Sequence, residues 1–384
     1  MMTLKQILIQ IADAIRGLNG KTEKISPQEF ENELLNISEP TLAASMVDNI
    51  GYGKNVFETV TIYGGCTEVQ SGSFAGCYIT NLNFEDGVKI IRSNSFSKNT
   101  KLTNIVLPKT IETIEVNAFQ SCTSLGGIIV HEENATYSSC GSNIIFEKGT
   151  STLVQGCKNS TIPEDTKIIG NYAFYDVNIT EIRIPDKVTT IGEYAFYNTP
   201  ITSLDLGSVK TINNIAFSKI RITTLTLPDS VISVSVSAFS GCTSLEEITM
   251  SKNITNTAGY CFSGCTLLNN VYFPKGSALT TLAQGIFSNC SSLEELVIPG
   301  SEDTEGNTQF RTIGNEVFNG CSNFKRLDLS QLNVIPTLGT NAFKGCHSDL
   351  KIIIPDDKYN DWISRTNWSD YKDNIIKASE YTES

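Results

Sequence analysis

A template built around one phenylalanine recurs along most of the chain, and it constrains the fold more than any other feature of the sequence. Residues 179–228 repeat it almost unchanged, as ITEIRIPDKVTTIGEYAFYNTP, ITSLDLGSVKTINNIAFSKIR and ITTLTLP. Most template phenylalanines are 21 to 25 residues apart. They are Phe74, Phe96, Phe119, Phe174, Phe196, Phe217, Phe239, Phe262, Phe287, Phe318 and Phe343. A fixed period of this length predicts a solenoid whose coils bury their apolar faces against one another.

Two other template positions carry residues suited to a packed interior. A small residue, usually alanine, precedes the phenylalanine, and an aliphatic residue stands five positions before it, with Thr257 as the exception. The aliphatic residues are Val69, Ile91, Ile114, Ile169, Ile191, Ile212, Val234, Leu282, Ile313 and Leu338. Because the same shapes recur at fixed offsets, stacked coils can fill their shared interior at high density.

A strand pattern begins about six residues after each phenylalanine. It has the form L-x-x-I-x-I and often ends in proline, as in 102–108, 222–228 and 293–299. Alternate residues point to the same side in a strand, and proline cannot extend the ladder. Each coil is therefore predicted to supply one strand to a long parallel sheet.

These repeats resemble the BspA-type leucine-rich repeats of bacterial surface proteins, from about residue 60 to the C-terminus. The most specific mark is the insert after Phe119, which includes TYSSCGSNIIFEKGTSTLVQGCKNSTIP and lengthens the period to 55. The resemblance implies a right-handed leucine-rich-repeat solenoid with a parallel sheet on one face and turns and short 3₁₀ or helical pieces on the other. It also implies binding to other macromolecules rather than catalysis.

The chain divides into four predicted segments. They are a helical hairpin (1–38), a transition (39–59), the solenoid (60–355, with the insert at about 131–163) and a C-terminal cap (356–384). A solenoid exposes a core-sized apolar face at its last coil, which a terminal element must cover. Trp362 and Trp368 are therefore interpreted as part of this lid, in preference to a sugar-stacking platform.

The first segment shows two amphipathic helices. Residues 4–15 keep helical spacing, and Ser26, Pro27 and Glu29 form a helix start with a capping box. The apolar stripe either covers the first coil or mediates self-association or docking onto a carrier. Residues 4–37 also resemble the N-terminal segment of structural or tail-associated proteins encoded by prophages of Gram-positive bacteria.

Charge and hydropathy restrict the class of partner and the cellular location of the protein. A net charge of −12 disfavours a nucleic-acid partner. The sequence contains no run of eighteen apolar residues, so no membrane-spanning helix is predicted. Gln10 and Asp13 interrupt the first apolar stretch, which is therefore not a signal peptide. Synthesis in the cytoplasm is expected, and display at the cell surface or on a phage-like particle remains open beside an intracellular location.

Eleven cysteines invite a metal or disulfide interpretation, but most of them occupy a repeat position. Seven stand three residues after a template phenylalanine: Cys77, Cys122, Cys242, Cys265, Cys290, Cys321 and Cys346. Buried, reduced thiols are expected there. Cys140 and Cys157 are the one pair considered for a disulfide. No metal site and no cofactor are predicted, and two histidines without a nearby nucleophile give no catalytic residues.

The outward side of the predicted sheet varies between coils, whereas the inward side repeats. The candidate binding residues on it are Tyr272, Val297, Arg326, Asp328, Ile353, Glu247 and Glu295. An aromatic ring, aliphatic groups and an arginine are residue types enriched at binding hot spots. The predicted partner is a protein or a glycan.

Three functions follow from these observations. The leading one is a non-enzymatic adhesive or receptor-binding protein. The second is an intracellular scaffold for protein partners, which the free thiols favour. The third is a carbohydrate-active enzyme, because two carboxylates of different coils could still meet in space.

Overall fold

The computed structural model describes residues 57–300 and 310–382. The helical hairpin predicted for residues 1–38 lies outside the described residues, as does most of the transition. The described chain is a β-solenoid, as the repeats predict, and its contacts group into two compact units.

Most coils contain two strands instead of the single predicted one. The second is a two-residue strand that holds the aliphatic residue five positions before the phenylalanine, as in β12 (Thr190–Ile191) and β13 (Thr211–Ile212). In both, the aliphatic residue is fully buried and the threonine is half-buried. A β-branched residue on each side suits a pleated, half-buried surface, and this explains why the short strand forms.

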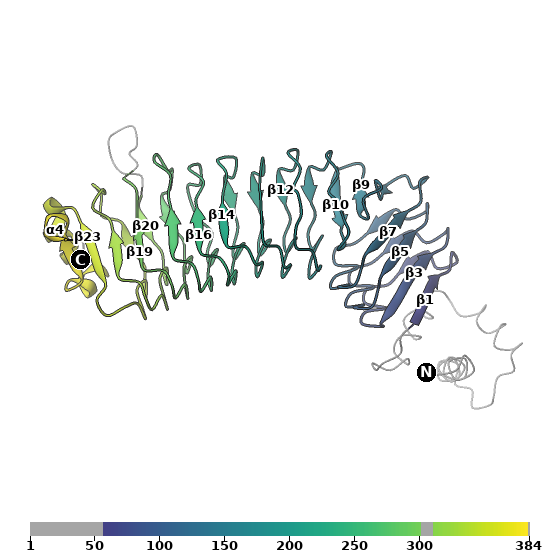
Figure 1. Cartoon of the computed structure of the whole chain (residues 1–384), viewed down its shortest axis with the longest axis horizontal. Helices are drawn as coiled ribbons and strands as arrows, with labels where there is room; N and C mark the ends of the chain where they lie inside the picture. Colours follow the sequence, from purple (N-terminus) through teal and green to yellow (C-terminus); the bar gives the residue numbers. More distant parts are fainter. Residues whose placement is uncertain (1–56, 301–309, 383–384) are drawn as a thin grey trace, which may run out of the picture. The chain divides into compact units, whose positions relative to one another are not determined.

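The first unit contains the described residues up to Gly149, with Val154–Ser160 and Asp176–Asn178. Its larger sheet is parallel, in the order β1 (Phe57–Ile62), β3 (Ile79–Phe84), β5 (Asn104–Leu107) and β7 (Gly127–Val130), which lie side by side in Figure 1. Its smaller sheet is β2 (Glu68–Val69), β4 (Ile90–Ile91) and β6 (Thr113–Ile114).

The insert packs onto the first unit. β8 (Tyr137–Ser138) pairs antiparallel with β9 (Ile145–Glu147). The Tyr137 hydroxyl accepts a hydrogen bond from the Ile114 N–H at 3.0 Å. The GCKN turn contributes Asn159, whose Nδ2 donates to the Gly126 carbonyl at 3.0 Å. The insert thus satisfies main-chain groups of the coil that precedes it.

The second unit contains Thr150–Leu153, Thr161–Tyr175 and the described residues from Ile179 onward. Its short strands pair in parallel in two groups. The first group is β10 (Thr152–Gln155), β11 (Ile168–Ile169), β12, β13 and β15 (Ser233–Val234). The second group is β18 (Thr281–Leu282), β20 (Thr312–Ile313) and β22 (Thr337–Leu338). Its other strands form two sheets, β14 (Thr224–Thr226), β16 (Glu247–Thr249) and β17 (Asn270–Tyr272), and β19 (Glu295–Val297), β21 (Arg326–Asp328), β23 (Lys351–Ile354) and β24 (Ile375–Lys377).

Two coils of the second unit depart from the strand prediction. Residues 179–185 and 201–206 follow the L-x-x-I-x-I pattern but form no strand. The Thr202 N–H still donates to the Thr180 carbonyl at 3.2 Å, so contact between the coils persists at the start of each segment.

The template phenylalanines stack as predicted, in one run within each unit. In the first unit the ring centroids of Phe74 and Phe96 are 5.2 Å apart. In the second unit the run extends from Phe174 to Phe343, with neighbouring centroids 5.0 to 6.1 Å apart. This continuous aromatic row forms the middle of the core.

The turns around each phenylalanine contain no 3₁₀ or helical piece in the described solenoid, contrary to the prediction. The residues two positions before and two after the ring have positive φ angles, for example Tyr194 (54°) and Asn198 (55°) around Phe196. A left-handed residue at every fourth position prevents a right-handed helix. These two residues and Phe196 instead donate their N–H groups to the next coil at 2.8 to 3.0 Å.

The repeated cysteines form hydrogen bonds as well as filling space. The Cys122 thiol donates to the Phe96 carbonyl of the preceding coil at 3.3 Å, and Cys321 donates in the same way to Phe287 at 3.0 Å. Where the cysteine is replaced by Asn99, its Nδ2 makes the equivalent bond to Phe74 at 2.7 Å. All eleven cysteines are free thiols, Cys140 and Cys157 included.

The C-terminal segment covers the last ring of the second unit. It comprises η1 (Asp356–Lys358), α4 (Tyr359–Ser364), η2 (Trp368–Tyr371), β24 and η3 (Ala378–Glu380), next to β23 in Figure 1. Trp362 and Trp368 are fully buried. Trp368 and Tyr371 lie 6.5 and 5.1 Å from the Phe343 ring. Both tryptophans are therefore lid residues. None of the described helices is long and apolar enough to cross a membrane.

Candidate functional site

The strand ladder of the second unit breaks between β17 and β19, which belong to different sheets although their coils are consecutive. On the C-terminal side of the break, the Ile298 N–H donates to the Asp328 carbonyl at 3.0 Å. Among the described residues, no equivalent bond connects the Phe273 N–H with the Val297 carbonyl. The sheet is thus open at the step from β17 to β19.

Coil spacing at the aromatic row is wide here but does not by itself account for the break, because β19 pairs with β21 across an equally wide spacing. The ring centroids are 6.1 Å apart for Phe262 and Phe287 and again for Phe287 and Phe318, compared with 5.1 Å for Phe196 and Phe217. The coil that carries β19 is therefore farther from both neighbours than coils in the middle of the row. It also follows and precedes longer connections, of 25 and 31 residues between phenylalanines.

The break exposes interior side chains. Val271 and Phe273 occupy inward template positions, yet both are only half-buried. On the other side of the break, the equivalent Leu296 and Ile298 are 1% exposed. Apolar groups that other coils bury are consequently accessible from the outward face.

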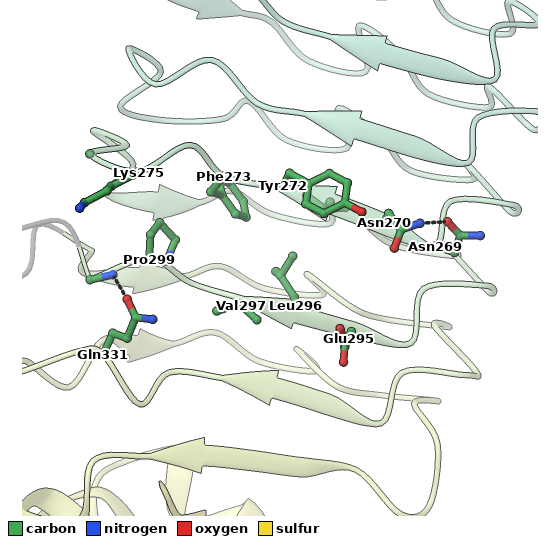
Figure 2. A pocket seen from close by; sticks show the side chains of 13 residues that line it. Asn269, Asn270, Tyr272, Phe273, Lys275, Glu295, Leu296, Val297, Pro299 and Gln331 are labelled. Atoms are coloured by element: carbon green, nitrogen blue, oxygen red, sulfur yellow. Dashed lines mark hydrogen bonds between the residues drawn. The ribbon is translucent and has the colours of Figure 1, made fainter. Parts of the chain in front are cut away.

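A pocket with a volume of about 710 Å³ occupies this place. Val271, Phe273 and Leu296 supply apolar surface, and Tyr272 and Val297 project beside them from the two strands (Figure 2). The remaining side chains that line it are those of Asn269, Asn270, Lys275, Glu295, Pro299 and Gln331. An apolar surface with a few polar groups at its edge is typical of a binding pocket.

Polar groups sit at both ends of the pocket. Asn269 and Asn270 lie at one end, where the Asn270 Nδ2 donates to the Asn269 Oδ1 at 2.7 Å (Figure 2). Gln331 lies at the other end, and its Oε1 accepts from the Gly300 N–H at 3.2 Å. Lys275 and Glu295 also line the pocket, and the Glu295 carboxylate is paired with Arg326 at 3.4 Å.

Three of the predicted site residues meet at this pocket. Tyr272 is 50% exposed and Val297 is 37% exposed, and Glu295 stands beside them. Glu247 lies on β16 next to Asn270 and does not line the pocket.

Arg326 and Asp328 lie one strand away and are partly buried. The Arg326 Nη1 is 3.4 Å from the Glu295 Oε2, and its Nη2 is 4.0 Å from the Asp328 Oδ2. The Tyr381 ring covers the guanidinium at 5.6 Å. Ile353 pairs in register with Asp328 and so keeps the predicted row, but it is only 2% exposed.

Sequence analysis missed Phe273, Lys275, Asn269 and Gln331 as site residues. The alternation predicts that Phe273 is buried, whereas it is half-buried beside the unpaired step from β17 to β19. Two signals pointed to this region, namely the 25-residue period after Phe262 and a bulky aromatic where neighbouring strands have methionine or isoleucine.

The pocket is lined by apolar and amide side chains, together with Tyr272, Lys275 and Glu295. Within residues 57–300 and 310–382, no group of three or more His, Cys, Asp or Glu side chains could hold a metal ion. The pocket combines an accessible apolar surface, one exposed tyrosine ring and amide groups, which are the features of a recognition surface.

Comparisons with known proteins identify the repeat. The model of the BspA type leucine rich repeat region matches in six copies over residues 22–147, 154–221, 210–310 and 302–364. A leucine-rich repeat protein from Eubacterium ventriosum is similar in structure, with 21% identity, a TM-score of 0.50, and 75% of this chain and 76% of that chain covered.

Two further structures are similar. One is a leucine rich cell surface protein from Faecalibacterium prausnitzii, with 22% identity, a TM-score of 0.49, and 80% and 82% of the two chains covered. The other is the pneumococcal vaccine antigen PcpA, with 17% identity, a TM-score of 0.48, and 84% of this chain and 66% of that chain covered. No curated protein matches the sequence.

Proposed function

Because the chain belongs to the BspA-type leucine-rich repeat family, we propose that it is a non-enzymatic protein-binding module whose recognition site is the pocket between β17 and β19. The observation that carries this proposal is the break in the sheet, which exposes Val271 and Phe273 beside Tyr272 and Val297. Aromatic anchors such as tyrosine, packed in a well-desolvated pocket with a polar edge, are among the few residues that supply most of the binding energy of protein interfaces.

A protein partner fits the pocket better than a glycan. The half-buried Val271 and Phe273 offer apolar surface, which gains free energy by burying an apolar side chain. A glycan is the second candidate, because Tyr272 exposes half of its surface and Asn269 and Asn270 offer amide groups.

We propose that the protein is adhesive or receptor-binding and is displayed at a bacterial cell surface or on a phage-like particle. The resemblance to BspA-type surface proteins supports the first location, and the prophage-like pattern of residues 4–37 supports the second. An intracellular scaffold is the alternative that eleven free thiols favour. Fractionation of the native cells and of any particles they release distinguishes the three.

Residues 1–38 are proposed to attach the protein to a carrier or to a second copy. Deleting them should leave a folded solenoid that still binds its partner but loses self-association or carrier binding. A large fall in melting temperature at unchanged oligomeric mass would show that the segment only covers the first coil.

Photo-crosslinking tests the location of the binding site directly. Tyr272 is replaced by p-benzoylphenylalanine in the full chain, which is then irradiated with its native cells. Tyr63, a tyrosine of the first unit that is 70% exposed, is replaced in the control. We expect a covalent adduct with one defined protein from position 272 and none from position 63. Adducts from position 63 alone, or none from either, would contradict the proposal.

A further inference from the structure

The pocket has features that select one class of partner segment. Resting on the proposed function, we propose that it binds one large apolar side chain carried by an extended polypeptide segment. Main-chain amides of that segment replace the hydrogen bonds that are missing between β17 and β19. The inference thus names the partner element that the pocket recognises.

Main-chain groups at both ends of the break are open. The Asn269 N–H donates to the preceding coil at 3.0 Å, and the Glu294 carbonyl accepts from the following coil at 2.8 Å. In the described chain no bond joins the Asn269 carbonyl to the Glu294 N–H, or the Phe273 N–H to the Val297 carbonyl. Each end thus presents one donor and one acceptor, which are obligatory hydrogen-bonding groups.

An extended peptide supplies the matching pattern. Every residue of such a segment carries one N–H and one carbonyl, and its side chains alternate between two sides. A segment lying over the break can direct its amides to the open groups and one side chain into the pocket. Strand-type peptide recognition combines main-chain hydrogen bonds with pockets for alternate side chains in this way.

The apolar lining of the pocket defines the side chain, whereas its volume exceeds that of any single side chain. About 710 Å³ is available, and the half-buried Val271 and Phe273 gain most from an aliphatic or aromatic group. A charged side chain is disfavoured, because burying a charge against Val271 and Phe273 costs free energy. Leucine, methionine and phenylalanine meet these requirements.

Methyl NMR spectroscopy of the full chain, labelled with ¹³C at the valine and leucine methyl groups, tests this inference with small probes. The probes are the N-acetyl methylamides of leucine, phenylalanine and alanine. We expect the leucine and phenylalanine probes to shift the methyl signals of Val271, Leu296 and Val297. The alanine probe should bind at least about tenfold more weakly, because it buries far less apolar surface.

A second probe isolates the main-chain contribution. N-acetyl-leucine methyl ester has the same side chain as the methylamide but lacks one N–H donor. It should bind several-fold more weakly if the peptide amide replaces a missing ladder bond. Equal affinity of ester and amide would overturn the main-chain part of the proposal.

Matched variants test the site. Val297 and Val106 both face outward from strands and are both 37% exposed. Val297→Asp should abolish the probe-induced shifts of Val271 and Leu296, whereas Val106→Asp should leave them unchanged. Shifts that survive Val297→Asp would place the probes elsewhere and overturn the proposal.

Two other outcomes are also decisive. If methyl glucoside or methyl galactoside shifts these methyl signals and the amide probes do not, the ligand of the pocket is a sugar and the peptide proposal is overturned. No shift with any probe would overturn the inference of an apolar anchor. The proposed function would still stand in that case if position 272 crosslinks to a protein, so the two failures are distinguishable.

Discussion

The role of some individual residues can be predicted from the sequence, whereas the backbone conformation of others cannot. The template phenylalanines repeat one chemical type, so their stacking could be predicted. The left-handed positions on either side could not, because they hold residues as different as Gly285, Asn94, Tyr194 and Ile215. Glycine and asparagine tolerate this conformation, whereas tyrosine and isoleucine adopt it only when the surroundings impose it. The next coil imposes it here by accepting their N–H groups.

Gly285 tests this requirement. A Cβ atom there would lie 2.3 Å from the Tyr260 ring, at a φ of +60°. We expect Gly285→Ala to cost roughly 2 to 3 kcal/mol, the sum of backbone strain and displacement of the ring. Gly276→Ala is the control, because its φ is +77° but nothing lies within 4 Å, and it should cost about 1 kcal/mol. Urea denaturation measures both, and equal costs would show that the ring moves freely.

Phe196 tests the aromatic row. Its ring is fully buried and lies 5.0 and 5.1 Å from those of Phe174 and Phe217. Phe196→Ala should reduce the free energy of unfolding by about 3 to 5 kcal/mol, because it leaves a cavity between two rigid rings. Val236→Ala, at a residue 48% exposed, should stay within about 0.5 kcal/mol. An unchanged denaturation midpoint for Phe196→Ala would refute the stacked core.

At the scale of strands and turns, the repeat predicts packing within one coil but not the contacts between coils. The offset between Phe119 and Cys122 predicts turn packing, but the acceptor of the thiol is the main chain of Phe96 in another coil. A sequence read one coil at a time does not show such a partner. The second strand of each coil was missed for a related reason, since two residues are too few for alternation to be visible.

Buried thiols make the free energy of unfolding fall as the pH rises into the alkaline range. Burial raises the pKa of Cys122 and of Cys321 to about 12. In the unfolded chain these thiols ionise near pH 8.5, so the folded protein binds more protons above that pH. Their contribution to stability is complete below about pH 8.5 and is lost as the pH rises toward 12. The slope is at most about 1.4 kcal/mol per pH unit for each thiol. Urea unfolding of Cys321→Ala at pH 8 and pH 10 should show a smaller decline than wild type, and an equal decline would be the contrary result.

Thiol reactivity tests the burial of the repeated cysteines. In denaturant, nearly all eleven cysteines should react with a thiol reagent without prior reduction. In the native protein the exposed Cys140 should react first, followed by the half-buried Cys66, Cys77 and Cys346. The fully buried thiols should not react, because burial also suppresses the thiolate. Several stable disulfides in the native protein, found by mass spectrometry, would contradict this account.

At the scale of the whole molecule, the solenoid was predictable and its binding site only partly so. The period, the ring and the aliphatic offsets are local and repeat, whereas the break between β17 and β19 is a departure of one pair of coils from the parallel pairing. Alternation correctly placed Tyr272 and Val297 outward, but it also placed Ile353 there, which the C-terminal segment covers. A site formed by a departure from the repeat is visible in the sequence only as an irregular period.

Hydrogen–deuterium exchange with and without the crosslinked partner tests the central claim most directly, since it reports on every face of the solenoid at once. Binding in the pocket predicts increased protection of residues 269–276 and 294–299, where main-chain groups at the break are open. The outward strands of the first unit, 79–84 and 104–107, should not change and serve as the internal reference. Protection confined to that reference or to the turns, with β17 and β19 unchanged, would contradict the account.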